Sequence, residues 1–226
     1  DRMRTNDETT AFYMDRHGDL YPSGTVSLDV FHFINVKNGP RPYVSPGNPD
    51  FASLKSLYAW KAGRAPGEDA DWPNLLAHAG VTESGDFDAD WAAVQAILRK
   101  QEAQRISALG RDFDDVVMLI HGYNNDHKDA RAWYGLVESD FRDEGARHGR
   151  RVAFVRMYWD GLKGKTPLFI WDNAQYNGYL VGLELRRLLA QVEGDTPLRV
   201  FTHSSGAYVI TNALGDASAG AQMGKM

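Results

Sequence analysis

From Asp114 to Leu214 the chain alternates short apolar runs with segments of helical periodicity, and this alternation constrains the fold more than any other feature. Val116 to Ile120 is a continuous apolar run, typical of a strand that is buried on both faces. Two more strands are expected at Val152 to Tyr158 and Leu198 to Phe201. Strands separated by helices form parallel sheets through right-handed crossovers. We therefore predict an α/β fold with a mostly parallel sheet flanked by helices.

Helices with one apolar face are expected before and between these strands. The predicted ranges are Phe51 to Ala62, Trp72 to His78, Ala89 to Leu109, Asp129 to Glu144, Asn173 to Val192 and Ala207 to Leu214. We expect Asp88 to cap the third of these, because a carboxylate accepts hydrogen bonds from the free amides of a helix start. Gly145 and Gly194 are expected to end the fourth and fifth, since glycine is common just after a helix.

The N-terminal part is predicted to form an antiparallel edge of the sheet. Ala11 to Met14 and Leu20-Tyr21 flank the turn-like cluster Asp15 to Asp19, which indicates a hairpin, and Val26 to Val36 alternates like a strand. The cluster contains residue types that bind metals, but its single histidine and its turn chemistry favour a hairpin loop. Asn38 to Pro49 is rich in Gly, Pro and Asn and predicts a long loop.

The 226 residues are interpreted as one α/β domain, with residues 38–110 as a helical and loop insertion within it. A sheet that stopped after Leu198 to Phe201 would leave an apolar central edge unpaired. We therefore expect further C-terminal strands that this sequence lacks. The chain begins at Asp1, which is consistent with a trimmed or partial protein.

Composition narrows the classes of partner and chemistry. A net charge of −5 with interspersed signs argues against nucleic acid as the main partner. The absence of cysteine excludes disulfides, thiolate catalysis and cysteine-bound zinc. No apolar run reaches the length of about 18 residues that a transmembrane helix needs, and the polar start lacks a signal-peptide core. The compartment stays open, with the cytoplasm as the default and secretion or the periplasm as alternatives.

Unusual residues follow each of the three predicted parallel strands, at ends that should meet along one edge of the sheet. Ser204 stands in Thr202-His203-Ser204-Ser205-Gly206, between a strand and a helix, which is the setting of a nucleophile elbow. His121-Gly122-Tyr123-Asn124-Asn125 follows the first strand and offers backbone amides for an oxyanion. Trp159-Asp160-Gly161 follows the second.

These three motifs, in this order, resemble the α/β-hydrolase superfamily, and within it bacterial esterase/lipase-like hydrolases with an HGYN loop and an H-S-x-G elbow. The resemblance implies hydrolysis of a carboxylic ester, with lipid esters among the candidate substrates, and without metal or organic cofactor. It implies Ser204 as nucleophile and the amides of Tyr123 and Ser205 as the oxyanion hole. Residues expected to line or support the site are His121, Gly122, Asn124, Trp159, Asp160 and Gly206.

In such hydrolases the acid and the histidine follow the nucleophile, yet no histidine follows Ser204 and Asp216 is the only later carboxylate. One interpretation is a longer hydrolase whose C-terminal part supplies both groups. The alternative is a binding or scaffold domain that keeps the fold without a complete triad. A third is an effector-like hydrolase that a protein partner completes. The expected substrate is a small-molecule ester or lipid.

Each candidate also has a structural interpretation. Ser204 could cap the following helix. His203 should point away from the Ser204 hydroxyl, because neighbouring strand residues face opposite sides, so we expect it to pack. We expect His121 to support the oxyanion loop through hydrogen bonds. We expect His127 to be exposed to solvent or to cap a helix.

Asp160 could orient a histidine or cap its loop. Trp159, Phe169 and Trp171 could line an acyl pocket, which is usually apolar, or pack in the core or in a lid.

Overall fold

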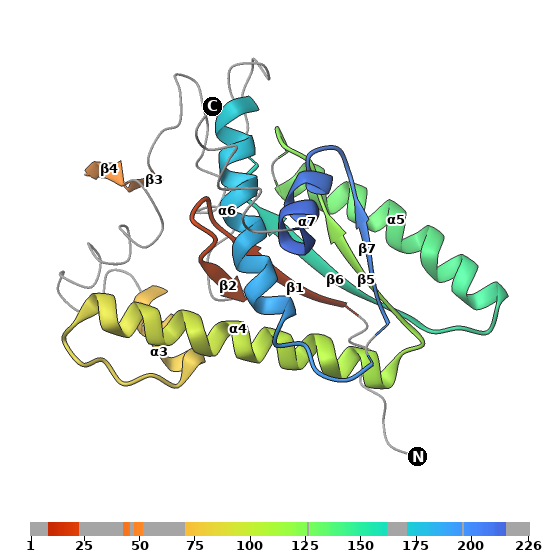
Figure 1. The fold of residues 1–226 in the computed structure, drawn as a ribbon, viewed down its shortest axis with the longest axis horizontal. Coiled ribbons are helices and arrows are strands. Elements are labelled where there is room, and N and C mark those ends of the chain that lie inside the picture. Colours follow the sequence, from red (N-terminus) through yellow and green to blue (C-terminus); the bar gives the residue numbers. More distant parts are fainter. Residues whose placement is uncertain are drawn as a thin grey trace.

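The protein has an α/β fold built around one mixed sheet (Figure 1). The computed structural model describes residues 9–22, 43–45, 48–51, 71–125, 127–161, 171–195 and 197–215. The strands of the main sheet are β1 (Thr9–Met14), β2 (Leu20–Pro22), β5 (Asp115–Ile120), β6 (Val152–Trp159) and β7 (Leu198–Thr202). They lie in the order β2-β1-β6-β5-β7. The predicted class is confirmed at this level, with a mostly parallel sheet and one antiparallel pair at its edge.

Strand β5 lies in the middle of the three strands that carry the motifs. All six of its residues are buried, as the continuous apolar run predicts. It pairs in parallel with β6 on one side and β7 on the other, so that Ile120 lies opposite Met157 and Thr202. The three strands therefore end at the same edge of the sheet.

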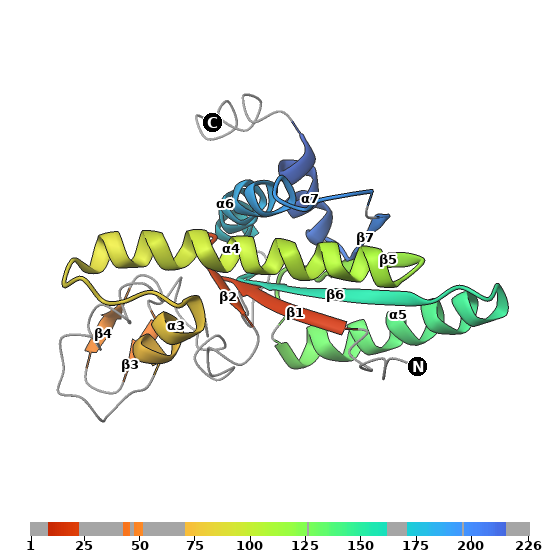
Figure 2. The same ribbon diagram turned by 90° about the horizontal axis from the view of Figure 1, so that it is seen from below.

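Helices cover both faces of the sheet. They are α3 (Asp71–Ala79), α4 (Phe87–Asp112), α5 (His127–Arg147), α6 (Trp171–Leu189) and α7 (Gly206–Leu214). Figure 2 shows α6 and α7 above the sheet and α5 below it. This placement follows from the strand order: α5 connects β5 to β6, whereas α6 carries the chain back across β5 to β7.

One hydrophobic core joins the sheet to these helices. Side chains of α4 such as Val94 and Leu98 belong to the same buried cluster as the strands. At one end of α4, the rings of Trp72 and Trp91 stack with centroids 5.7 Å apart, and Phe87 packs against both. The interpretation of residues 38–110 as an insertion stays a prediction.

The N-terminal hairpin and its antiparallel edge are confirmed, because β2 pairs antiparallel with β1 at the edge of the sheet. Strand β1 pairs in parallel with β6, and only β2 is antiparallel, paired with β1. Between them, the Asp15 amide donates to the Asp19 carbonyl at 3.0 Å, and Gly18 has a φ of 84°. A hairpin necessarily reverses direction, so one of its strands must run with the parallel sheet. The strand predicted at Val26 to Val36 lies outside the described residues.

The prediction of a long loop at Asn38 to Pro49 is wrong in part. A small hairpin of β3 (Tyr43–Ser45) and β4 (Asn48–Phe51) occupies part of it. Gly- and Pro-rich stretches separate the strands of hairpins as well as forming loops, so composition alone did not distinguish the two. The helix predicted from Phe51 to Ala62 begins on a residue that belongs to β4, and its remainder lies outside the described residues.

Three residues predicted to cap or end helices do not do so. Asp86, not Asp88, caps α4, and its carboxylate accepts from the Ala89 amide at 3.1 Å. Helix α5 continues past Gly145, where an added Cβ would lie 2.8 Å from Val152 Cγ2, so this glycine permits close packing instead of ending the helix. Helix α6 ends at Leu189, five residues before Gly194.

Candidate active site

Ser204 occupies a strained turn between β7 and α7. Its φ is 52°, in the left-handed region that costs a non-glycine residue about 1–2 kcal/mol. The turn is closed by bonds from the Gly206 amide to the His203 carbonyl and from the Ala207 amide to the Ser204 carbonyl, both 3.0 Å. The Ser204 side chain is exposed. The cap residue of α7 is Ser205, so helix capping does not account for Ser204.

Two glycines allow this turn to lie against the end of β5. A Cβ on Gly206 would lie 2.5 Å from the Ile120 carbonyl oxygen and 2.7 Å from that of His121. A Cβ on Gly122 would lie 2.9 Å from Ser204 Cβ. A real Cβ essentially never lies within 3.0 Å of backbone oxygens or of another Cβ, so both positions require glycine for the loop after β5 and the Ser204 turn to touch.

The loop after β5 is held from several sides. The Asn124 amide donates to the Gly161 carbonyl at 3.0 Å, and Asn124 itself has a φ of 57°. The Asn125 side-chain amide donates to the carbonyls of Gly122 and Tyr123, at 3.1 and 3.2 Å. The Tyr123 amide, an expected oxyanion donor, donates instead to Ser205 Oγ at 2.6 Å. These bonds hold the loop in place. One of the two expected oxyanion donors, the Tyr123 amide, is thereby already engaged.

His121 is a buried, neutral support for this loop. Its ring is 3% exposed, Nδ1 lies 2.8 Å from the Gly122 carbonyl, and Nε2 accepts from the Trp159 amide at 3.1 Å. These two contacts assign the proton to Nδ1. Burial lowers the His121 pKa to about 4, although the hydrogen bond to Gly122 opposes this shift. Such a ring cannot act as the base for Ser204, because both of its nitrogens are engaged.

Trp159 and Tyr134 tie β6 to β5 at the same place. The Trp159 indole N–H donates to the His121 carbonyl at 2.7 Å, and its ring stacks on that of His121 with centroids 5.8 Å apart. The Tyr134 hydroxyl accepts from the His121 amide at 3.1 Å and donates to the Met157 carbonyl. Trp159 is 2% exposed and lies in the core. No sequence signal marked Tyr134, because its partners are far away along the chain.

Asp160 lies on the far side of β6 from Ser204 and faces the N-terminal hairpin. Its carboxylate is 3.4 Å from Arg16 Nε, and its carbonyl accepts from the Asn177 side-chain amide at 3.0 Å. Asp15, fully buried beside it, accepts from two hairpin amides and the Tyr21 hydroxyl. Burial, together with the charges of Asp19 and Asp160, raises the Asp15 pKa well above its usual value. This arrangement anchors the hairpin and does not bring a carboxylate to Ser204.

The remaining candidates lie around the elbow. The His203 ring is exposed and packs against Trp133, with centroids 5.4 Å apart. His127 is the first residue of α5 and is half-buried. Trp171 is 36% exposed and meets Tyr123 edge-on at 4.8 Å, so it lies next to the loop after β5. Phe169 and Asp216 lie outside the described residues.

Ser204, the expected nucleophile, has no hydrogen-bonded base among the described residues. Among them, no histidine or carboxylate hydrogen-bonds the Ser204 hydroxyl, and no group of three or more metal-ligand side chains could hold an ion. None of the described helices is both long enough and apolar enough to cross a bilayer.

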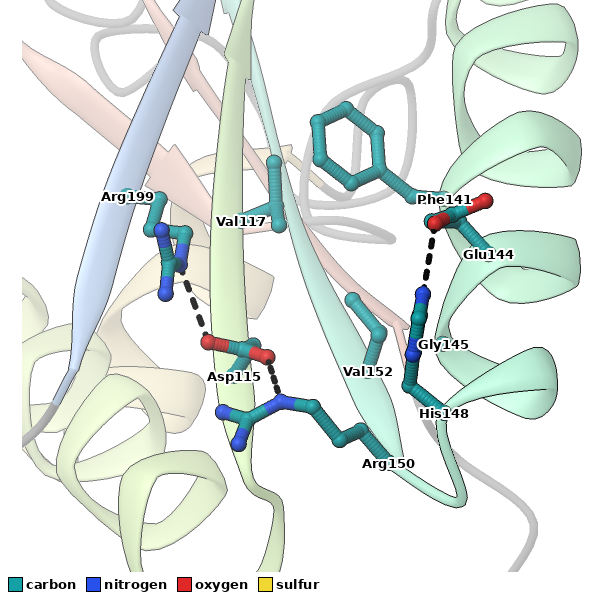
Figure 3. Close-up of a pocket in the computed structure, with 9 residues that line it drawn as sticks. All are labelled: Asp115, Val117, Phe141, Glu144, Gly145, His148, Arg150, Val152 and Arg199. Carbon is teal, nitrogen blue, oxygen red and sulfur yellow. Dashed lines mark hydrogen bonds and ion pairs between the residues drawn. The ribbon is translucent and has the colours of Figure 1, made fainter.

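A pocket of about 180 Å³ lies at the opposite end of the strands (Figure 3). It is lined by Asp115 and Val152, which begin β5 and β6, and by Arg199 near the start of β7. The Asp115 carboxylate accepts from Arg150 at 2.7 Å and from Arg199 at 2.9 Å, and the bond from Arg150 is the main cause that lowers its pKa. The pocket is thus separate from the Ser204 edge, and its central charge is already paired.

Comparisons of the chain with protein-family models, curated proteins and solved structures find no match.

Proposed function

We propose that this chain carries the nucleophile of a serine hydrolase with an α/β-hydrolase fold, which cleaves a carboxylic ester through an acyl-enzyme at Ser204. The observation that carries the proposal is the positive φ of Ser204, 52°, at an exposed turn between a parallel strand and a helix. Strain of this kind persists only where the surroundings impose it, and it clusters at active sites. An ordinary linker serine has no physical reason to occupy this conformation.

The neighbouring loop supports the same conclusion. Gly122 approaches Ser204 so closely that no side chain fits between them. The Ser205 amide, immediately after the nucleophile, has no hydrogen-bond acceptor among the described residues. It also lies at the start of α7, where the helix dipole favours negative charge. An oxyanion formed next to Ser204 Oγ would meet this amide.

The chemistry then follows the general course of acyl transfer. Ser204 Oγ attacks the ester carbonyl carbon while a base takes its proton, and the carbonyl oxygen becomes a tetrahedral oxyanion. Collapse expels the alcohol, which receives that proton, and leaves an acyl-serine. Water hydrolyses the acyl group by the same two steps and restores Ser204. The base is a histidine that is not among the described residues, supplied by the same polypeptide or by a partner.

The second candidate is a binding or scaffold domain of the same fold. The specific observation in its favour is that no described histidine or carboxylate forms a hydrogen bond with the Ser204 hydroxyl. This candidate predicts that Ser204 is chemically inert even in the full-length protein.

A fluorophosphonate probe separates the two candidates, since it labels a serine only where a base and an oxyanion hole are assembled. We expect the full-length protein to gain the mass of one probe, localised to Ser204 by peptide mapping, and Ser204→Ala to gain none. Ester turnover should fall in Ser204→Ala on the order of 10⁶-fold. Circular dichroism checks that the variant folds. An unlabelled full-length protein, or one labelled only at another serine, would contradict the hydrolase proposal.

A further inference from the structure

The Tyr123 amide cannot serve an oxyanion directly in this arrangement. Its single N–H donates to Ser205 Oγ at 2.6 Å, which is a short bond for a neutral donor and acceptor. An amide has one proton, so while this bond exists the group has nothing left to donate. The oxyanion hole implied by the family resemblance therefore lacks one of its two donors.

The Ser205 hydroxyl proton is available to donate a hydrogen bond, whereas the Tyr123 N–H is not. A hydroxyl can accept two hydrogen bonds and donate one. Ser205 Oγ accepts from Tyr123, and its side chain makes no capping bond to α7. Among the described residues, no acceptor is found for the hydroxyl proton. Ser205 is only 9% exposed, so water has limited access to satisfy this proton.

The place of this hydroxyl is set by the elbow. Ser205 follows the nucleophile directly, and its own amide is also without an acceptor among the described residues. The N–H of Tyr123 polarises the Ser205 hydroxyl, which makes its proton a better donor than an isolated hydroxyl would be.

We propose that the side-chain hydroxyl of Ser205 is a catalytic hydrogen-bond donor to the oxyanion, backed by the Tyr123 amide, and acts beside the Ser205 backbone N–H. This inference rests on the proposed hydrolase function. No proton changes owner in the step: the hydroxyl keeps its proton and shares it with the oxyanion oxygen, and the Tyr123 N–H remains bonded to Ser205 Oγ. The hydrogen bonds strengthen as negative charge develops, which is how a donor of this kind lowers the barrier.

The competing interpretation is that the Ser205 hydroxyl blocks the hole. In that case its removal frees the Tyr123 amide to bind the oxyanion. The two interpretations predict opposite effects of Ser205→Ala on turnover.

The test measures hydrolysis of 4-nitrophenyl acetate by the full-length protein and three variants at position 205. We expect Ser205→Ala to lower kcat about 10²- to 10³-fold with KM changed by less than about threefold, the effect of losing one oxyanion donor. Ser205→Thr, which keeps the hydroxyl, should retain kcat within about tenfold. Ser205→Cys keeps the size but donates weakly, and should resemble Ser205→Ala if the alanine variant proves unstable.

The outcomes distinguish a failure of the hydrolase function from a failure of the Ser205 role alone. Wild-type protein that neither turns over the ester nor takes the fluorophosphonate at Ser204 overturns the hydrolase function and the role of Ser205 with it. Active wild-type protein together with a Ser205→Ala or Ser205→Cys variant of equal or higher kcat overturns the role of Ser205 alone, and identifies Tyr123 as the direct donor.

Discussion

Acid should destabilise this protein through His121, whose ring is held neutral in the core. The ring is 3% exposed, and its Nε2 must remain an acceptor for the Trp159 amide. Protonation would place a charge in an apolar environment and set two donors against each other. Burial is the main cause that lowers the His121 pKa from 6.5 to about 4.

The sign and size follow from proton linkage. Between pH 6.5 and pH 4 the unfolded chain binds a proton at His121 and the folded chain does not, so the free energy of unfolding falls as the pH falls. The contribution is fully present above the unfolded pKa and is lost toward the folded one. At about 1.36 kcal/mol per pKa unit, the whole effect is about 3 kcal/mol, of which about 2 kcal/mol is lost between pH 7 and pH 5.

Two buried carboxyls act in the opposite direction. Burial raises the pKa of Asp15 and of Glu102, so the folded state binds protons at these groups more readily than the unfolded chain and gains stability as the pH falls. The pH dependence of the wild type alone therefore does not isolate His121. A comparison between variants does, because the carboxyl contributions cancel in it.

Urea unfolding, followed by tryptophan fluorescence at pH 7 and pH 5, gives the required free energies for wild type, His121→Gln and His148→Gln. Glutamine can accept a hydrogen bond but does not titrate, and His148 is 65% exposed, which makes its variant the matched control. Wild type and His148→Gln should each lose about 2 kcal/mol more than His121→Gln between the two pH values. Equal losses in all three proteins would refute the reasoning.

Two further predictions concern the elbow. Gly206→Ala should lower the free energy of unfolding by about 1–3 kcal/mol, because its Cβ would meet backbone oxygens at 2.5 and 2.7 Å. Gly135→Ala, the control with open space around the added Cβ, should instead raise the free energy of unfolding by up to about 1 kcal/mol. Chemical denaturation measures both changes, and equal effects would contradict the packing argument. Ser204→Gly should have a free energy of unfolding up to about 1 kcal/mol higher than Ser204→Ala, because glycine adopts a φ of 52° without strain. If the glycine variant is instead less stable than the alanine variant, the turn stores no strain.

Much of the fold could be predicted from the sequence. The apolar run of β5, the amphipathic faces of α4 and α6, and the strand-turn-helix setting of Ser204 are local patterns, and each appears in the structure where it was expected. Local periodicity reports which residues of a segment are buried. It does not report which segments become neighbours, so the parallel pairing of β1 with β6 and the engagement of Asp160 by Arg16 were not foreseen.

The candidate site likewise combines features that the sequence predicts with contacts that only the fold creates. By itself, the sequence determined that Ser204, Gly122 and Gly206 stand at strand ends, because their spacing from apolar runs is local. Only the tertiary structure decided that the Tyr123 amide bonds to Ser205 Oγ, 82 positions away, and that Tyr134 holds the amide of His121. Hydrogen bonds between distant loops depend on sub-ångström positions that the packing of the whole sheet sets, and residue order carries no direct record of them.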